Sequence, residues 1–318
     1  MSQRWVIYAS EELDGICAAA IVLRYGRLRG EEPKLGGFFN YVNYNSVLDQ
    51  MAMLENCLFF VLGFSPEKIS SIEEKLVKLT KRNRIVYWSS WQPCSEHTTT
   101  VMKRFVKIFD ALSAKDGKEG LICATEFAYN RFLPNDLVAS ALMSIASDIS
   151  LWQRRDQRAV KLADIIAANF DKRQLVDALS KGIFWCQEFE EFRAEYLKRK
   201  AHLLTQLKNT IVVKSYLNKN FAFGLADKSL SPGDATQAIL DSPNIDVAVV
   251  VYKDGGLTFR RKAGCAINMK ALARLFGGGG HAHAADASIA SEFRSISLEN
   301  FGKALFFIER KIKDYLLS

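Results

Sequence analysis

The feature that most narrows the possible folds is the alternation of short apolar runs with helical patterns in the first half of the chain. Apolar runs of strand length occupy residues 5–9, 57–62 and 84–88. A stretch with helical periodicity follows each run, the first two at 15–25 and 66–81. Strands that alternate with helices favour a parallel sheet covered by helices on both faces. The first half is therefore predicted to be an α/β domain.

The loops that follow these strands mark the predicted site. Ligands of parallel sheets bind at the carboxyl ends of the strands. Those ends lie at residues 10–14, 63–65 and 89–93. We expect these three loops to converge on one cleft.

The second half predicts a smaller α/β domain with a mixed sheet. A chain of 318 residues is long enough for two domains. Residues 186–209 have helical periodicity with an acidic start and a basic end, which suits the helix dipole and an exposed linker helix. The predicted domains are thus 1–185 and 210–318. Strands are expected at 210–216, 221–225, 246–252 and 257–262, and helices at 233–240, 268–276 and 298–317.

The run GGGGHAHAAD at residues 277–286 predicts an anion-binding loop. Successive glycine N–H groups can surround an anion because no side chain obstructs them. The alternative is a tight turn that requires glycine for its backbone conformation.

Composition points to a polyanionic partner. The formal net charge is +8 and the pI is about 9.1, which favours nucleic acid or an acidic surface. The six cysteines are widely separated and are expected to be reduced. The longest apolar runs are shorter than the roughly 20 residues of a membrane-spanning helix, and the N-terminus lacks a leader pattern. A cytoplasmic protein without membrane contact is expected.

The chain resembles the DHH phosphoesterase family, specifically its members with a DHH-associated C-terminal domain, such as RecJ-like nucleases and nanoRNases. The resemblance rests on GGGGHAHAA at 277–285, with weaker support from LDGICAAA at 13–20 and ASDISLW at 146–152. It implies that a phosphate is contacted by the glycine loop and by an arginine of the segment LTFRRK. The implied residues are Gly278, Gly279, Gly280, His281 and Arg260.

The same resemblance implies a metal site that has lost most of its ligands. Active members hold two manganese or magnesium ions on eight positions. The corresponding residues of this chain are Ser10, Glu12, Asp14, Gly63, Ser89, Ser90, Trp91 and Asp148. Hard divalent ions require several charged oxygens, so Ser10, Gly63 and the triplet 89–91 cannot replace the lost ligands. No cofactor is expected, and Asp14 and Asp148 are the candidates for a single manganese or magnesium ion.

Basic and aromatic residues near these positions suggest further contacts with a nucleic acid. Arg154, Arg155 and Arg158 would add positive charge near the groove. Three tryptophans could stack on bases, although burial in the core explains them equally well. They are Trp88, Trp91 and Trp152.

The leading hypothesis is a catalytically inactive DHH-family protein that binds nucleic acid or nucleotide phosphate in the interdomain cleft. By resemblance, it could be a subunit of a replication, repair or RNA-processing assembly with protein partners. One alternative is a residual single-metal phosphoesterase acting on short oligonucleotides or nucleotide phosphates. The others are a nucleotide-binding sensor and a protein scaffold that binds no nucleotide.

Overall fold

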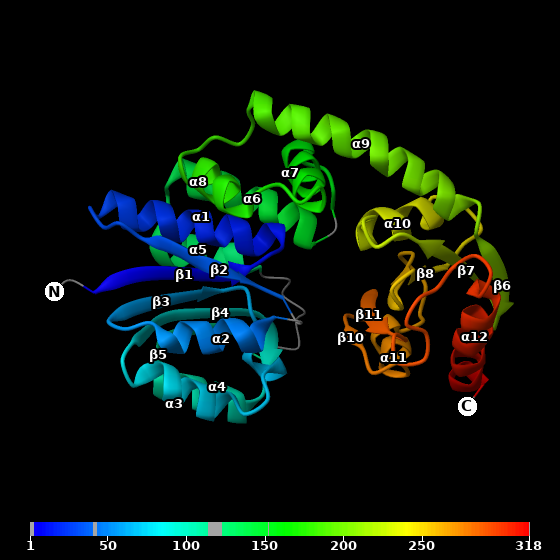
Figure 1. Cartoon of the computed structure of the whole chain (residues 1–318), viewed down its shortest axis with the longest axis horizontal. Coiled ribbons are helices and arrows are strands. Elements are labelled where there is room, and N and C mark those ends of the chain that lie inside the picture. The colour runs from blue at the N-terminus through cyan, green and yellow to red at the C-terminus, as the bar shows by residue number, and fades with distance from the viewer. Residues whose placement is uncertain (1–2, 41–42, 114–122, 152, 318) are drawn as a thin grey trace. The chain divides into compact units, whose positions relative to one another are not determined.

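The chain divides into two compact units, Met1–Arg193 and Ala194–Ser318. The computed structural model describes residues 3–40, 43–113, 123–151 and 153–317 (Figure 1). The division falls inside helix α9 (Gln187–Lys208), which occupies the stretch where a linker helix was expected. The boundaries at 185/186 and 209/210 stay a prediction.

The first unit contains a five-stranded, all-parallel sheet in the order β2–β1–β3–β4–β5. Its strands are β1 (Arg4–Ser10), β2 (Lys34–Phe39), β3 (Cys57–Leu62), β4 (Arg84–Cys94) and β5 (Val106–Ser113). Two of them, β2 and β5, were not predicted. The sequence of β2, KLGGFF, contains two glycines, which weaken a strand pattern. Strand β5 follows a helix with no intervening turn residue to mark its start.

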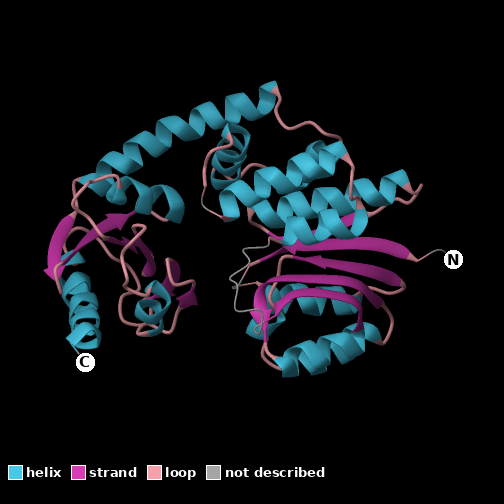
Figure 2. Ribbon diagram, turned by 180° about the vertical axis from the view of Figure 1, so that it is seen from behind, coloured by secondary structure: helices cyan, strands magenta, loops and turns pink. Residues whose placement is uncertain are grey.

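Helices cover both faces of this sheet, as the alternating pattern predicted (Figures 1 and 2). In β3, Phe60 and Leu62 belong to one buried cluster, and Phe59 and Val61 belong to the cluster on the opposite face. One face carries α1 (Leu13–Leu28), α5 (Ala124–Phe132), α6 (Leu137–Ser150), α7 (Gln157–Ala167) and α8 (Lys172–Ser180). The other carries α2 (Tyr44–Met53), η1 (Pro66–Lys68), α3 (Ile72–Thr80) and α4 (Glu96–Phe105).

The second unit contains a mixed six-stranded sheet in the order β10–β11–β9–β8–β7–β6. Strands β7 and β8 are parallel, and the other neighbours are antiparallel. The strands are β6 (Val212–Tyr216), β7 (Lys219–Ala226), β8 (Val247–Tyr252), β9 (Gly256–Arg261), β10 (Gly279–Gly280) and β11 (Ala284–Ser288). The prediction of an α/β fold with a parallel first sheet and a mixed second sheet is confirmed.

Helices also cover both faces of the second sheet. All six residues of β8 are buried; Val247, Val249 and Val251 face one cluster, and the alternating residues face the other. The first cluster lies against α11 (Met269–Arg274) and α12 (Phe301–Leu317), and the second against α10 (Pro232–Leu240). No helix in the described part of the chain is long and apolar enough to cross a membrane.

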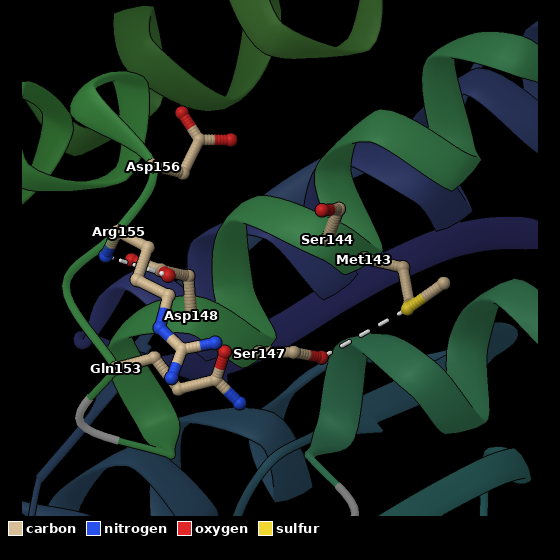
Figure 3. Close-up of a pocket in the computed structure, with 7 residues that line it drawn as sticks. All are labelled: Met143, Ser144, Ser147, Asp148, Gln153, Arg155 and Asp156. Carbon is tan, nitrogen blue, oxygen red and sulfur yellow. Dashed lines mark hydrogen bonds between the residues drawn. The ribbon is translucent and has the colours of Figure 1, made fainter.

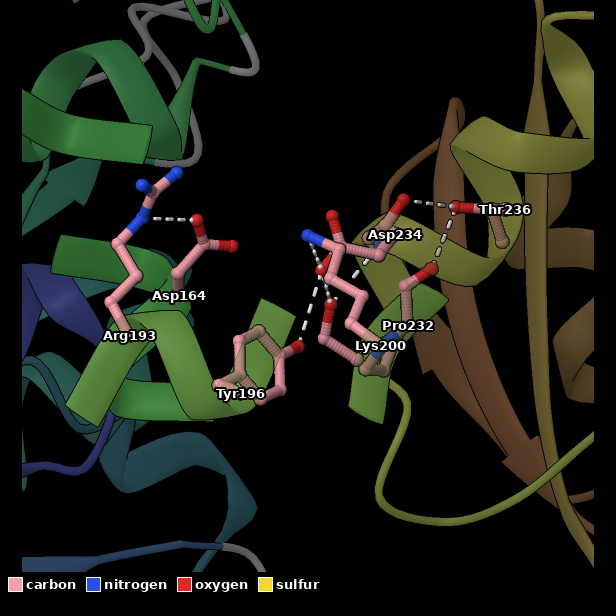
Figure 4. A network of polar contacts seen from close by, with 9 residues as sticks. Asp164, Arg193, Tyr196, Lys200, Pro232, Asp234 and Thr236 are labelled. Atoms are coloured by element: carbon pink, nitrogen blue, oxygen red, sulfur yellow. Dashed lines mark hydrogen bonds and ion pairs between the residues drawn. The ribbon is translucent and has the colours of Figure 1, made fainter. Parts of the chain in front are cut away.

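Partly buried ion pairs connect α9 with a neighbouring helix in each unit (Figure 4). In the first unit, Arg193 Nε lies 2.9 Å from Asp164 Oδ2. In the second, Lys200 Nζ lies 2.7 Å from Asp234 Oδ2, and Tyr196 donates to the same oxygen at 3.4 Å. Removing Arg193 or Lys200 would leave the charge of Asp164 or Asp234 uncompensated, so each pair stabilises its own unit.

Candidate functional site

Three of the predicted positions converge at the carboxyl edge of the parallel sheet. Ser10 ends β1, Gly63 directly follows β3, and Ser89 lies in β4. The amide of Gly63 donates to the carbonyl oxygen of Ser89 at 3.1 Å and faces its Oγ at 3.2 Å. A Cβ atom built on Gly63 would lie 3.4 Å from Ser10 Oγ. The structure therefore brings together the residues that the strand ends predicted.

Gly63 occupies a conformation that disfavours an aspartate. Its φ is +72°, in the left-handed region that favours glycine. A Cβ atom there would also lie 3.2 Å from the Cβ of Ala124, the first residue of α5. A carboxylate side chain at this position would need backbone strain and a shift of α5.

The carboxylate of Asp14 accepts hydrogen bonds from the N-terminus of α5. Its Oδ2 accepts from Ala124 N at 2.8 Å, and its Oδ1 accepts from Thr125 N at 2.8 Å and Thr125 Oγ1 at 2.6 Å. Asp14 is 8% exposed. Free N–H groups and partial positive charge at a helix start favour a carboxylate. Both oxygens of Asp14 are thus directed at protein donors.

The contact between Asp14 and α5 was not predicted, because no helix was expected at residues 124–132. The signal in the sequence was a threonine followed by Glu126, since acidic residues are favoured in the first turn of a helix. Burial and the nearby charge of Asp14 raise the pKa of Glu126. Glu126 is therefore a second carboxyl group close to Asp14.

Residues 89–93 were predicted to be a loop, but the structure shows them as part of strand β4. Strand β4 continues through Ser89 and Ser90 to Cys94, because its neighbour β5 supplies pairing partners, including Asp110 for Ser89. Ser89 and Ser90 are fully buried, and Ser90 Oγ donates to the carbonyl oxygen of Gln92 at 2.9 Å. Two of the three residues at the triplet position are thus buried strand residues.

Glu12 lies apart from this buried group. It is exposed at the residue before α1, and its side chain does not cap that helix. Its neighbour Glu11 contacts the Asn40 side chain at 3.1 Å and Lys172 at 3.9 Å. The two glutamates are therefore surface residues of the loop.

Of the three tryptophans suggested for base stacking, the structure describes only the side chain of Trp88. Trp88 is fully buried, and its Nε1 donates to the carbonyl oxygen of Phe64 at 2.8 Å. It cannot stack on a base, so that suggestion was wrong for Trp88. The side chain of Trp91 and the whole of Trp152 lie outside the described residues.

Asp148 lies near the end of α6 and orders the chain that follows (Figure 3). Its Oδ1 accepts from Arg155 N at 2.9 Å, and its carbonyl oxygen accepts from Gln153 N at 2.8 Å. Its Oδ2 is buried and accepts no hydrogen bond from the described residues. Asp148 lines a cavity of about 550 Å³ together with Ser144, Ser147 and Arg155. One carboxylate oxygen of Asp148 is thus buried without a hydrogen bond from the described residues.

The chain neighbour of Asp148 contacts the residue that precedes α5. Ser147 Oγ lies 3.5 Å from the sulfur of Cys123, which precedes α5. Burial, followed by the charge of Asp14, raises the pKa of Cys123 to about 12, so its thiol is protonated. Among the described residues, no three histidine, cysteine, aspartate or glutamate side chains are grouped as metal ligands. The carboxylates that the described residues place near this edge are Asp14, Glu126 and Asp148.

The arginines after α6 are partly neutralised. Arg158 forms an ion pair with Asp156 at 2.7 Å, and Asp156 accepts the Arg158 amide at 2.8 Å. Arg155 is exposed and lines the cavity beside Asp148. Arg155 is therefore the better placed of these two to contact a ligand.

The glycine run of the second unit is half of a β-hairpin. Gly279 and Gly280 form β10 and pair with Asp286 and Ala285 of β11. The amide of Gly278 donates to the carbonyl oxygen of Ala273 at 2.9 Å. The expected cradle of successive amides is therefore not formed, because part of the run pairs within the chain.

Local packing and backbone conformation explain why glycine occupies positions 278 and 280. A Cβ atom on Gly278 would lie 2.1 Å from the carbonyl oxygen of Asp286. Gly280 has φ +146°, and its Cβ atom would lie 2.5 Å from Ala285 Cα. The hairpin requires glycine at these positions whether or not an anion binds.

One amide of the hairpin points outward. The amide of His281 donates to the carbonyl oxygen of Ala284 at 2.7 Å. Bonded and non-bonded pairs alternate along an antiparallel ladder, so the preceding pair of Gly280 and Ala285 is non-bonded. The Gly280 amide therefore points away from β11, at the edge of the sheet.

Arg260 and Arg261 lie on opposite faces of β9, as expected for adjacent strand residues. Arg261 Nε donates to the carbonyl oxygen of Ala282 at 3.1 Å, and Arg261 NH1 donates to that of Cys265. Arg260 pairs with Ala284 of β11 and with Ala248 of β8. His281, Ala284 and Arg260 thus occupy one cross-strand row, with a small alanine between the two longer side chains. This row is the candidate phosphate contact.

Two further contacts lie next to the row of His281, Ala284 and Arg260. The rings of His281 and His283 stack, with centroids 5.6 Å apart. On the face that Arg260 shares, Thr258 Oγ1 donates to Asp286 Oδ1 at 2.7 Å. The Asp286 carboxylate is thus oriented by Thr258, two residue pairs along the ladder from Arg260.

Comparison with solved structures identifies the fold as that of the DHH-domain proteins. The chain is similar to a DHH domain described as a member of the S1p family of ribosomal proteins, with a TM-score of 0.67, 13% identity, and 98% of this chain and 87% of that chain covered. It is also similar to RecJ of Thermus thermophilus in complex with Mn²⁺, with a TM-score of 0.62, 13% identity, and 99% of this chain but 52% of that chain covered.

A third similar structure is PggH of Vibrio cholerae, a pGpG-specific phosphodiesterase. The TM-score is 0.55 and the identity is 12%, with 98% of this chain and 100% of that chain covered. No family model and no curated protein matches the sequence. At these identities the likeness defines the fold.

Proposed function

We propose that this chain binds the phosphate groups of a nucleotide or nucleic acid on the second unit and does not carry out two-metal hydrolysis. The observation that carries the proposal is the position of Asp14, whose two oxygens accept three hydrogen bonds from α5. A bridging metal ligand must direct its oxygens at cations. Here the positive end of a helix takes that place.

The other family positions support the same conclusion. Gly63 has no side-chain ligand, and Ser89 and Ser90 are neutral and buried in a strand. Neutral hydroxyls do not replace the charged oxygens and imidazoles that a pair of divalent ions requires. Asp148 has one buried oxygen that accepts no hydrogen bond from the described residues, and a single carboxylate does not supply the ligands of two divalent ions.

The hydrogen-bond donors of the second unit favour phosphate as the ligand. Arg260 and His281 can both donate to an oxyanion from one row, and the Gly280 amide points outward at the sheet edge. A guanidinium matches the geometry of phosphate oxygens. The names of similar structures, an exonuclease RecJ and a pGpG-specific phosphodiesterase, support a nucleotide or nucleic acid as the source of that phosphate.

The first experiment measures metal and catalysis together. Manganese is titrated calorimetrically into the chelator-treated protein, and a single-stranded oligonucleotide is incubated with protein and manganese or magnesium. We expect neither tight binding nor cleavage. Binding with cleavage, both lost in Asp14→Asn, would show that the chain is an active phosphoesterase.

The second experiment measures ligand binding without metal. Arg260→Ala is expected to weaken nucleotide binding about tenfold or more, because a charge-assisted hydrogen bond contributes about 1.5–3 kcal/mol. Arg294→Ala is the matched control, since it removes an exposed arginine from the same unit. A series of strand lengths separates the two ligand classes: affinity that rises with length and falls steeply with salt indicates a strand, and a plateau at a dinucleotide indicates a sensor.

A further inference from the structure

A basic pocket lies where β4 and β5 begin. Ser10 and Gly63 lie at the other end of this parallel sheet, where the strands finish. The strands are parallel, with Ile85 paired to Val106 beside the pocket. The pocket has a volume of about 460 Å³. Its lining includes Asn83, Arg84, Lys103, Arg104, Phe105 and Lys107.

The charged side chains that line this pocket are all basic. Arg84, Lys103, Arg104 and Lys107 belong to the lining, which contains no aspartate or glutamate. Arg84, Lys103 and Lys107 are exposed, and among the described residues none of the three has a carboxylate within ion-pair distance. Arg104 pairs with Glu73 at 2.6 Å. Three cations of the lining therefore remain uncompensated.

The backbone that carries these cations is held firmly. The buried side chain of Asn83 accepts from Cys57 N at 3.0 Å and donates to the carbonyl oxygens of Leu54 and Leu79 at 2.7 and 3.3 Å. These contacts fix the residue next to Arg84. Helix α4 passes directly into β5, and Val106 N donates to the carbonyl oxygen of Met102. Lys103 and Lys107 thus lie on two regular elements joined without a loop.

The basic side chains exceed what the local structure needs. The C-terminus of α4 carries a partial negative charge of roughly one half, which Lys103 or Arg104 alone would balance. Arg84 is the first residue of β4 and Lys107 the second residue of β5, so neither balances the charge of a helix terminus. A surplus of guanidinium and ammonium groups around a concave surface favours a ligand with several anionic oxygens.

We propose that this pocket is a second phosphate-binding site, which takes the phosphate groups of a nucleotide or of a nucleic-acid strand. Its volume is within the range of small-ligand sites, roughly 300–1,000 Å³. The site belongs to the first unit and shares no residue with the Arg260 row. It goes beyond the proposed function and does not depend on it.

The test uses inorganic pyrophosphate as the probe and Arg260→Ala as the starting chain, so that the remaining binding reports on the first unit. Adding Arg84→Ala and Lys107→Ala is expected to weaken pyrophosphate binding at least tenfold. The matched control adds Lys303→Ala and Lys313→Ala, which remove two exposed lysines of α12 and should leave binding unchanged. Circular dichroism and thermal melting check that each variant is folded.

A second arm distinguishes the sources of phosphate. For a single-stranded oligonucleotide, loss of both contacts should reduce the salt slope by about 1.4, because each phosphate contact to a single strand contributes about 0.7. An unchanged slope with weakened pyrophosphate binding assigns the pocket to a free nucleotide.

Two results would overturn the proposal. One is equal pyrophosphate affinity with and without Arg84 and Lys107. The other is binding of a polyglutamate peptide in the absence of any pyrophosphate binding, which would make the surface a protein-docking site. Neither result bears on Arg260, whose own variant is measured separately.

Discussion

Thr125 donates both its backbone amide and its hydroxyl to one oxygen of Asp14, at 2.8 and 2.6 Å. The two residues are far apart in the chain, and the contact joins the start of α1 to the start of α5. An aspartate that the sequence analysis named as a candidate metal ligand thus accepts hydrogen bonds from a helix N-terminus.

Asp14→Ala is expected to destabilise the protein by about 2–4 kcal/mol, because three donors would lose a charged acceptor in a buried setting. Urea unfolding at pH 7 measures the change. The control Glu32→Ala removes an exposed carboxylate and should change stability by less than about 0.5 kcal/mol. Full stability of Asp14→Ala, together with lost manganese affinity, would argue that Asp14 is a metal ligand instead.

Two glycine substitutions in the run 277–280 are expected to differ in their effect on stability. Gly280→Ala should cost about 3 kcal/mol or more, since φ is +146° and the new Cβ would lie 2.5 Å from Ala285 Cα. Gly277→Ala should cost only about 1 kcal/mol, because φ is +70° but the space around it is open. Thermal melting of the two variants tests this order. Equal effects would mean that β10 does not pack against β11 as observed.

The Arg24–Asp136 pair predicts a dependence of stability on pH. Burial opposes ionisation of Asp136, but hydrogen bonds from Arg24 and from Ala139 N outweigh it and lower its pKa. A lowered folded-state pKa means that this stabilisation is complete above the unfolded value of about 3.9 and is lost as pH falls through the folded value. Asp136→Asn should therefore destabilise the protein by about 1–2 kcal/mol at pH 7.

The difference between the natural chain and Asp136→Asn should shrink as the pH falls below about 4. Urea unfolding between pH 3 and pH 7 follows it. A difference that is constant with pH would show that the loss arises from packing and not from the charge of Asp136.

The cysteines should differ in reactivity. Cys186 is partly exposed, and the other five are buried. Burial also raises the pKa of Cys17 and Cys94, and the thiolate is the reactive form. Titration of the folded protein with a chromogenic disulfide at pH 8 should therefore show one rapid thiol, and the rest should react only on unfolding. Cys186→Ser should remove the rapid phase, and its persistence would place another thiol at the surface.

The sequence by itself determined the class of fold and which strand ends of the first sheet lie together. Apolar runs such as β3 are buried on both faces, so their composition already required helices above and below the sheet. The alternation of strands and helices set their direction, and parallel direction places Ser10, Gly63 and Ser89 at one edge. The strong helices and strands of the second unit were predicted for the same reason, since periodicity follows from which side chains are buried.

Only the tertiary structure decided how these residues are used. Strand β5 and the extension of β4 depend on pairing with each other, which no local pattern encodes. The role of Asp14 depends on Thr125, which the fold brings to it across more than a hundred residues. The glycine run became a hairpin because β11 offers it partners. Pairing and burial between distant segments, rather than local propensity, thus determine the chemistry of both units.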